Sequence, residues 1–145
     1  DLRVTTDPTT AAAGIDLLIE AVPEKLPLKR EVFRRFHPLA PPAAVFVTNT
    51  STLLPSSMAE ASGRPDRFAA MHFNLERDLV EIMPHPGTAA ATIARLRAFC
   101  DAIRHVAIVC QLEFPGYVFN NLLMMLNGTA ITLAANGVAS VEDID

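Results

Sequence analysis

Short apolar runs alternate with helical spacings of apolar residues along most of this chain. The run at residues 14–22 (GIDLLIEAV) is continuous and bounded by turn formers, as expected of a parallel strand that is buried on both faces. A second buried strand is predicted at 43–50 (AAVFVTNT), and further strands are predicted at 67–73, 78–83 and 105–110.

The segments between these runs carry helix signals. Amphipathic spacing predicts a helix within 24–36, where Pro27 fits the first turn but not the interior. A short helix is predicted at 54–62 and ends at Gly63, and a longer one begins at a cap formed by Thr88. This alternation of strands and helices predicts an α/β fold with a twisted, largely parallel sheet.

A long apolar helix follows the sheet segments. Residues 114–137 open with Pro115 and Gly116 and close at Gly137, which predicts a helix of roughly 20 residues. Such a helix leaves the sheet layer, so a domain boundary is expected after residue 113. Its apolar stripe predicts a core or subunit interface and consists of Leu122, Leu123, Met125, Leu126, Ile131 and Leu133.

Composition and charge narrow the possible partners. Half of the 145 residues are hydrophobic and 19% are charged, so the chain can bury a core. A net charge of −4 and the lack of a basic stripe argue against nucleic acid, and no apolar run reaches the roughly 20 residues that span a membrane. Cys100 and Cys110 match no disulfide framework or metal spacing, and we interpret them as reduced, buried thiols of a cytoplasmic protein.

Both ends of the sequence carry incomplete patterns. A dinucleotide-binding half-fold begins with a strand, G-x-G-x-x-G and a helix, and none of the six glycines is arranged that way. If the sheet binds a nucleotide, it is therefore the second half of such a fold, and the phosphate-binding half would lie before Asp1. At the other end, Ser140 with the acidic residues after it predicts the start of another helix.

Four polar residues stand where they could do chemistry. Ser51 follows a predicted strand at the end where α/β sheets bind ligands, His72 ends the next strand, Glu81 lies within a third, and Asn120 begins the long helix. Oxidation of an alcohol needs a base near neutral pKa, which imidazole provides, and a carboxylate can orient that imidazole. A hydroxyl and a carboxamide can hold the substrate oxygen.

Each of these residues also has a purely structural interpretation. A single histidine at a strand end, or a single glutamate on a strand, more often has a packing or pairing role, and serine or asparagine at such positions usually bonds locally. The histidines do not form a metal triad, because no pair is spaced four apart on a helix. From these residues alone, the catalytic and structural interpretations both remain open.

Six motifs in order resemble the family of L-3-hydroxyacyl-CoA dehydrogenases. They are IEAVPEKLPLKREVF, VTNTSTL, RPDRFAAMHF, LVEI, PGYVFNNLL and GVASVEDID, and the resemblance as a whole runs from about Thr6 to Asp145. The resemblance implies that residues 1–113 form the second half of a Rossmann-type NAD-binding domain. It also implies that residues 114–145 begin an all-α C-terminal domain, which carries the homodimer contact and part of the substrate site.

The resemblance assigns roles to individual residues. It implies that His72 takes the 3-hydroxyl proton of an L-3-hydroxyacyl-CoA, that Glu81 orients His72, and that the product is a 3-oxoacyl-CoA. It places Ser51 and Asn120 at the substrate and requires no metal. The residues that it places at the NAD site are Ala21, Glu24, Lys29, Asn49, Ser51 and Asn74.

The sequence departs from the family pattern between His72 and Glu81, where the connection is shorter and no proline follows Asn74. Either the turn is tight and the pair persists, or the pair is uncoupled. Two alternatives therefore stand beside the dehydrogenase: a redox-inactive structural or oligomerising homologue, and a Rossmann dehydrogenase for another small hydroxy acid. Without a glycine-rich half, the segment by itself is expected to bind NAD poorly and to be weakly active or inactive.

Overall fold

One five-stranded sheet forms the centre of the computed structural model, which describes residues 2–74 and 78–145. The strands lie side by side in chain order, and each pair of neighbours is parallel except β3 and β4, which are antiparallel. The largely parallel sheet predicted from the sequence is confirmed. Its strands are β1 (Leu17–Glu20), β2 (Val45–Thr48), β3 (Phe68–Phe73), β4 (Leu79–Pro84) and β5 (Val106–Val109).

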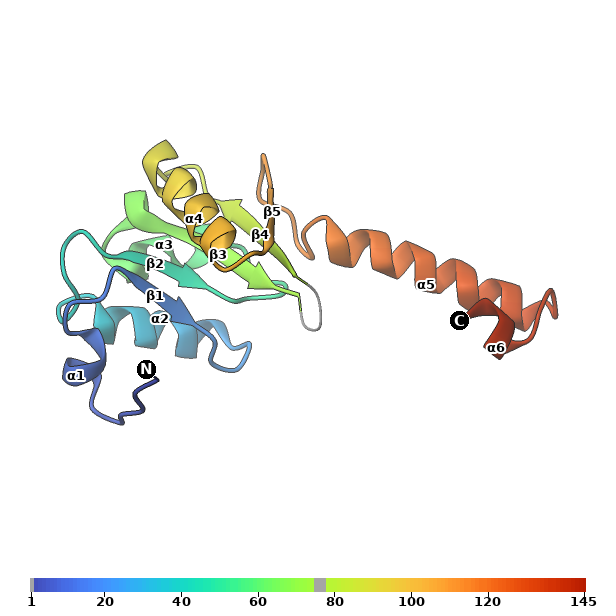
Figure 1. Ribbon diagram of the computed structural model, residues 1–145, viewed down its shortest axis with the longest axis horizontal. Helices are drawn as coiled ribbons and strands as arrows, with labels where there is room; N and C mark the ends of the chain where they lie inside the picture. Colours follow the sequence, from blue (N-terminus) through green and yellow to red (C-terminus); the bar gives the residue numbers. More distant parts are fainter. Residues whose placement is uncertain (1, 75–77) are drawn as a thin grey trace.

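The helices lie on both faces of the sheet and beyond one end of it (Figure 1). Pro27 lies in the first turn of α2, and Gly63, with φ 65°, ends a 3₁₀ turn after α3, both as predicted. The Ser140 side chain accepts a hydrogen bond from the Asp143 N–H and caps α6, also as predicted. The helices are α1 (Pro8–Ala12), α2 (Leu26–Phe36), α3 (Ser56–Ala59), α4 (Ala90–Ala102), α5 (Phe119–Ala135) and α6 (Val141–Ile144), with 3₁₀ turns η1 (Glu60–Ser62) and η2 (Pro65–Arg67).

The prediction that residues 14–22 form a strand buried on both faces is wrong. The strand covers only Leu17–Glu20 and lies at an edge of the sheet, where Ile19 is 39% exposed and only Glu20 is buried. A continuous apolar run does not reveal whether a neighbouring strand covers it. Only the strand pairing reveals the edge position, because β1 pairs with β2 and with no other strand among the described residues.

The predicted Thr88 cap of α4 is also wrong. The helix begins one residue later, with Ala89 at its N-cap, and no side chain caps it. The Thr88 hydroxyl instead donates to the Phe68 carbonyl and accepts from the His85 N–H. A threonine before a helix can satisfy either the helix or a neighbouring strand, and here the start of β3 takes its hydrogen bond.

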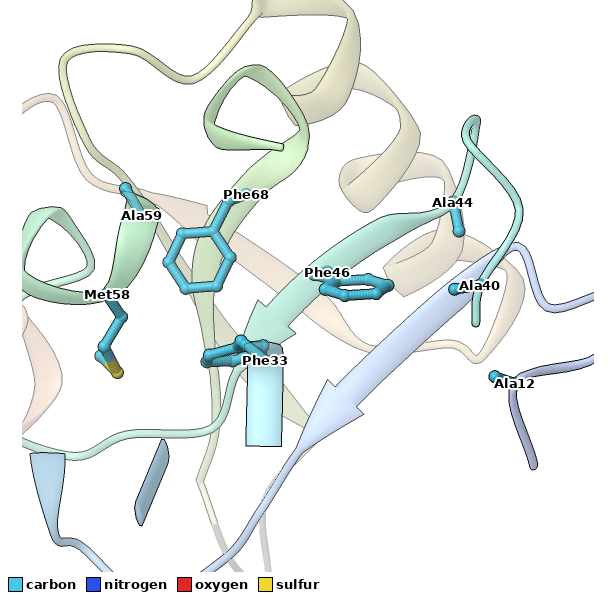
Figure 2. Packing of buried hydrophobic residues seen from close by; sticks show 8 residues of the cluster. All are labelled: Ala12, Phe33, Ala40, Ala44, Phe46, Met58, Ala59 and Phe68. Carbon is cyan, nitrogen blue, oxygen red and sulfur yellow. The ribbon is translucent and has the colours of Figure 1, made fainter. Parts of the chain in front are cut away.

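Two apolar layers hold the helices to the sheet. Phe33 of α2 packs between Phe46 and Phe68, with ring centroids 6.2 and 5.0 Å away, and Met58 and Ala59 of α3 join them (Figure 2). On the opposite face, α4 contributes Leu96 and Cys100 to a cluster with alternate residues of β2, β3 and β4. Cys100 and Cys110 are free and buried, as predicted.

Helix α5 extends away from the sheet (Figure 1). Within α5, all of which the structure describes, no side chain is buried, and Leu122, Met125 and Leu126 are each at least 66% exposed. The predicted stripe therefore does not belong to the core of this sheet, and its role as an interface stays a prediction. No described helix is long and apolar enough to cross a membrane.

The Phe33 cluster yields a stability prediction. We expect Phe33→Ala to lower the free energy of unfolding by about 3–5 kcal/mol, because the fully buried ring leaves a cavity between α2 and the sheet. Leu112→Ala, at a side chain that is 79% exposed, should change it by no more than about 0.5 kcal/mol. Urea unfolding followed by circular dichroism checks this, and similar losses in both variants would contradict it.

Candidate active site at the carboxyl ends of the central strands

His72 and Glu81 are direct partners across the antiparallel pair β3–β4. Their side chains leave the same face of the sheet, since residues directly opposite each other in a ladder share a face. The pairing continues to the Asn74 N–H, which donates to the Leu79 carbonyl at 3.1 Å. The shortened connection noted in the sequence falls partly on residues 75–77, which lie outside the described residues. On either side of it, the histidine and the glutamate face each other.

Glu81 is completely buried and divides its two carboxylate oxygens between two neighbours. Oε1 accepts hydrogen bonds from the backbone N–H groups of Val118 and Phe119, both at 2.9 Å, at the start of α5. Oε2 lies 3.6 Å from His72 Nδ1 and accepts a 3.4 Å hydrogen bond from Asn74 Nδ2. The positive end of the α5 dipole and the imidazole therefore share this one negative charge.

The imidazole of His72 is mostly buried, with one nitrogen toward Glu81 and the other toward Ser51. Nδ1 has no hydrogen bond that meets ordinary geometry, since Glu81 Oε2 is 3.6 Å away. Nε2 lies 3.3 Å from Ser51 Oγ. The tautomer with its proton on Nδ1 faces the carboxylate and leaves Nε2 as an acceptor, which is the arrangement that a general base requires.

A pocket of about 400 Å³ opens beside the Nε2 edge of His72. Ser51, His72 and Asn120 border it together, so the structure brings the predicted Ser51, His72 and Asn120 to one place, with Glu81 directly behind the histidine. The pocket lies where β2 and β3 end, as expected for ligand sites of α/β sheets. Its lining consists of Asn49, Ser51, His72, Phe73, Asn74, Phe119, Asn120 and Leu123.

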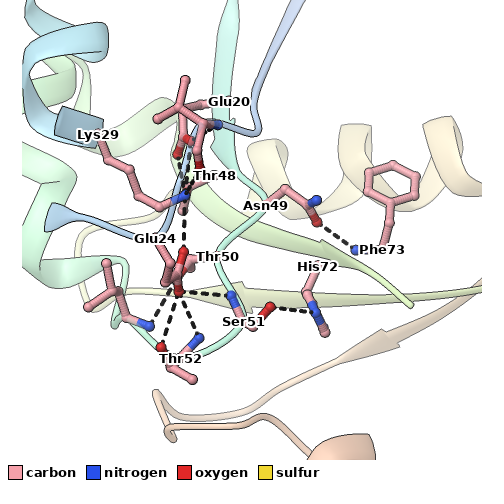
Figure 3. A network of polar contacts seen from close by, with 12 residues as sticks. Glu20, Glu24, Lys29, Thr48, Asn49, Thr50, Ser51, Thr52, His72 and Phe73 are labelled. Carbon is pink, nitrogen blue, oxygen red and sulfur yellow. Dashed lines mark hydrogen bonds and ion pairs between the residues drawn. The ribbon is translucent and has the colours of Figure 1, made fainter. Parts of the chain in front are cut away.

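Glu24 and Lys29 lie beside this pocket in a polar network that reaches Ser51 (Figure 3). The Lys29 ammonium is 1% exposed and lies 2.9 Å from Glu20 Oε1 and 3.2 Å from Glu24 Oε2. Oε1 of Glu24 in turn accepts hydrogen bonds from the Ser51 N–H at 3.1 Å and from the side chain of Thr50. The buried lysine thereby holds a carboxylate that fixes the loop carrying Ser51.

The remaining predicted cofactor residues lie in two different places. Asn49 and Asn74 border the pocket, and Asn49 Oδ1 also accepts from the Phe73 N–H at 2.9 Å, which joins the β2 loop to β3. Ala21 lies apart from it, on a groove of about 330 Å³ along the exposed edge of β1. Among the described residues, no group of three or more acidic, histidine or cysteine side chains is arranged to hold a metal ion.

Sequence reasoning missed two residues of this site. Tyr117 is 2% exposed, and its ring stacks on the His72 imidazole with centroids 4.9 Å apart. Glu20 supplies the buried partner of Lys29 and also accepts from Thr48 Oγ1 at 2.6 Å. An acidic residue that ends an apolar strand just before a lysine-bearing helix was the available signal for Glu20. Nothing in the sequence pattern places Tyr117 over the histidine.

The network around Glu24 predicts a pH-dependent stability. Burial opposes ionisation of Glu24, but hydrogen bonds from Thr50, Thr52 and Lys29 outweigh it and lower its pKa from 4.5 to about 2. A depressed folded-state pKa adds stability that is present above pH 4.5 and is lost as the pH falls toward 2. Because the carboxylate is 37% exposed, solvent screening limits this contribution to about 1 kcal/mol.

We therefore expect Glu24→Gln to unfold at lower urea concentration than the unchanged protein at pH 7, with a difference that shrinks between pH 4.5 and pH 3. Glu31→Gln, on the exposed side of α2, serves as the matched control and should show no comparable difference at pH 7. A Glu24→Gln difference that stays constant from pH 7 to pH 3 would contradict this account of the network.

Comparison with known proteins places this chain in a family. Residues 1–113 match the family described as 3-hydroxyacyl-CoA dehydrogenase, NAD binding domain. The mitochondrial hydroxyacyl-coenzyme A dehydrogenase of Rattus norvegicus is 37% identical over 147 aligned residues, which cover 99% of this chain and 46% of that protein. Because that relative is mitochondrial, the cytoplasmic location expected from the cysteines stays a prediction.

Two further relatives carry different names. A solved structure of a diketoreductase, described as acting on dicarbonyl compounds, has a TM-score of 0.88 and 39% identity over 97% of this chain and 51% of its own. The 5-formyl-3-hydroxy-2-methylpyridine 4-carboxylate 5-dehydrogenase of Mesorhizobium japonicum is 29% identical over 99% of this chain and 48% of its own. The chain thus spans about half the length of these relatives. It belongs to the NAD-binding-domain family of the 3-hydroxyacyl-CoA dehydrogenases.

Proposed function

We propose that this chain supplies the catalytic base and part of the cofactor site of an NAD-dependent 3-hydroxyacyl-CoA dehydrogenase. The observation that carries the proposal is the orientation of His72, whose Nδ1 faces buried Glu81 while its Nε2 faces Ser51 and the pocket. The family of the chain supports the reaction, an oxidation of L-3-hydroxyacyl-CoA to 3-oxoacyl-CoA or the reverse.

The pocket fits the reactive end of the cofactor. Carboxamides of Asn49 and Asn74 and the hydroxyl of Ser51 line it beside the flat apolar walls of Phe73 and Phe119, which suits a planar ring that carries an amide. When bound there, NAD accepts or donates the hydride of the reaction. Asn49, Asn74 and Ser51 would hold that end, and the groove at Ala21 would hold a more distant part.

His72 moves the proton in this proposal. In the oxidation, Nε2 takes the 3-hydroxyl proton from a substrate in the pocket, and in the reverse direction it returns that proton to the 3-oxo oxygen. The imidazolium that forms gains its stability from Glu81, which lies 3.6 Å from Nδ1 in a site without bulk water around the carboxylate. Glu81 keeps the proton on Nδ1 in the resting state.

Ser51 and Asn120 hold the substrate oxygen while its charge changes. Ser51 Oγ lies 3.3 Å from His72 Nε2, and Asn120 borders the same pocket, so all three polar groups are available to a substrate oxygen there. The roles of Glu24 and Lys29 are less direct than the sequence implied. We propose that Lys29 forms ion pairs with Glu20 and Glu24 and does not contact the cofactor. Glu24 fixes the loop that carries Ser51, and its exposed side faces the cofactor.

Two alternatives can be compared with this site. A redox-inactive homologue would be free to lose the histidine–carboxylate arrangement, whereas here the two groups face each other across paired strands. A dehydrogenase for another small hydroxy acid retains some support, since the Mesorhizobium relative is named for a pyridine carboxylate. Parallel assays with acetoacetyl-CoA and with simple 3-oxo acids that lack CoA distinguish these possibilities.

We also propose that residues 114–145 begin a helical domain that pairs two copies of the chain. The family match ends at residue 113, and α5 extends from the sheet with an exposed apolar surface. An exposed apolar stripe on a helix is usually covered by another protein surface. In soluble proteins that surface most often belongs to a second copy of the same chain in a closed homodimer.

The base assignment predicts the effect of two substitutions. We expect His72→Ala to lower kcat for acetoacetyl-CoA reduction by NADH by about 10²- to 10⁴-fold, because the proton donor is lost. Glu81→Gln should lower kcat with little change in KM, since it leaves an acceptor for the start of α5 but removes the charge that faces His72. Steady-state assays of the complete protein check both, with His105→Ala, a histidine outside the pocket, as control. Full activity in His72→Ala would refute the proposal.

The interface proposal is tested on α5 itself. Leu126→Glu places a charge on the exposed apolar surface and should convert a dimer of the complete protein into monomers. Asn127→Glu adds the same charge at an exposed polar position of the same helix and should leave the dimer intact. Sedimentation equilibrium measures both masses. A dimer that persists in Leu126→Glu would move the interface elsewhere.

A further inference from the structure

Tyr117 contacts His72, the proposed base, from the turn before α5 and not from β3 or β4. Its ring lies nearly parallel to the His72 imidazole, with an interplanar angle of 17° and centroids 4.9 Å apart. Its hydroxyl donates to the Thr50 carbonyl at 2.7 Å, next to Ser51. One buried side chain thus contacts the imidazole with its face and the Ser51 loop with its tip.

The backbone of Tyr117 is held in an unusual conformation. Its φ is 56°, in the left-handed region that bulky residues rarely adopt, and Gly116 before it has φ 80°. Asn121 stabilises this turn, since its Nδ2 donates to the carbonyls of Pro115 at 2.9 Å and of Tyr117 at 2.6 Å. A non-glycine residue keeps such a conformation only when its surroundings determine it, and residues of this kind cluster at functional sites.

The same turn directs the start of α5 to Glu81. Immediately after Tyr117, the N–H groups of Val118 and Phe119 donate to Glu81 Oε1. The turn therefore places a ring on the histidine and two donors on its carboxylate partner within three consecutive residues. Both members of the pair are therefore contacted from the turn that leads into α5.

We propose that Tyr117 is a positioning residue whose stacked ring sets the plane of the His72 imidazole from the turn that leads into α5. This inference rests on the function proposed above, because it takes His72 as the base. Tyr117 does not line the pocket, so we assign it no contact with the substrate. It acts through His72.

The need for such a residue follows from the polar contacts of His72. The strand pairing fixes the backbone of His72, but rotation of an imidazole about its last bond is only weakly restricted by itself. The two polar contacts of the ring are long, 3.6 Å to Glu81 and 3.3 Å to Ser51, so they define its plane poorly. A stacked ring blocks that rotation, and burial raises the pKa of Tyr117, which keeps its hydroxyl protonated as a donor to Thr50.

Two substitutions at position 117 separate the ring from the hydroxyl. Tyr117→Leu removes the stacked face and should lower kcat for acetoacetyl-CoA reduction by about 10- to 100-fold, with KM changed less than about threefold, because misaligned catalytic groups cost rate more than binding. Tyr117→Phe keeps the face and loses only the bond to Thr50, so it should retain kcat within about threefold of the unchanged protein.

A spectroscopic readout makes the result independent of turnover. The Tyr117 ring current should displace the His72 ring-proton signals in NMR spectra, assigned by their loss in His72→Ala. Tyr117→Leu should move those signals and Tyr117→Phe should not. Phe33→Leu, at a fully buried ring in the core cluster, is the matched control; it should lower stability while leaving both kcat and the His72 signals unchanged.

The outcomes separate this inference from the proposed function. Unchanged kcat in Tyr117→Leu, or a loss of similar size in Phe33→Leu, would overturn the positioning role and leave the dehydrogenase proposal intact. If Tyr117→Leu fails to fold, Tyr117→Phe decides, because a tenfold loss or displaced His72 signals there would contradict a role of the ring face. Absence of activity in the unchanged protein would overturn the proposed function, while the His72 signals still test the contact.

Discussion

The burial of the Glu81 carboxylate is the constraint on which the site depends. An ionised carboxylate without water must have its charge balanced and its oxygens hydrogen-bonded, because an unpaired buried charge is very costly. Two amides at the start of α5 and one from Asn74 supply the hydrogen bonds, and the imidazole of His72 faces the remaining side. The same carboxylate thus contacts both the start of α5 and the imidazole of His72.

A second buried charge organises the opposite side of the pocket. Lys29 is enclosed by Glu20 and Glu24, and Glu24 extends the network to the backbone of the loop that carries Ser51. The two systems meet where Ser51 Oγ approaches His72 Nε2 (Figure 3). Ser51 is therefore held from β1 and α2, and His72 is contacted from β4 by Glu81, which the start of α5 holds in turn. This division explains why residues distant in the sequence converge on one pocket.

The spacing of apolar and turn-forming residues predicted where strands and helices lie better than it predicted what packs against them. The apolar runs located every described strand, and proline, glycine and serine signals located the ends of α2, η1 and α6, because these depend on local backbone preferences. The exposure of β1 and the hydrogen bond of Thr88 depend on what lies next to them in space. For the same reason the motifs indicated His72, Glu81, Ser51 and Asn120 but not Tyr117, whose place over the imidazole follows from a left-handed turn.

The antiparallel ladder explains how a shortened hairpin can retain a pair of facing side chains. His72 and Glu81 face each other because five consecutive residue pairs of β3 and β4 are in register, from Ala69 opposite Pro84 to Phe73 opposite Val80. Residues removed beyond the last of these pairs shorten the connection without shifting the register, whereas a slip of one residue would turn one side chain to the other face. The buried apolar residues of both strands oppose such a slip, since it would move Met71 or Ile82 out of the apolar cluster that they form with α4. Core packing, rather than loop length, therefore preserves the alignment of the two residues.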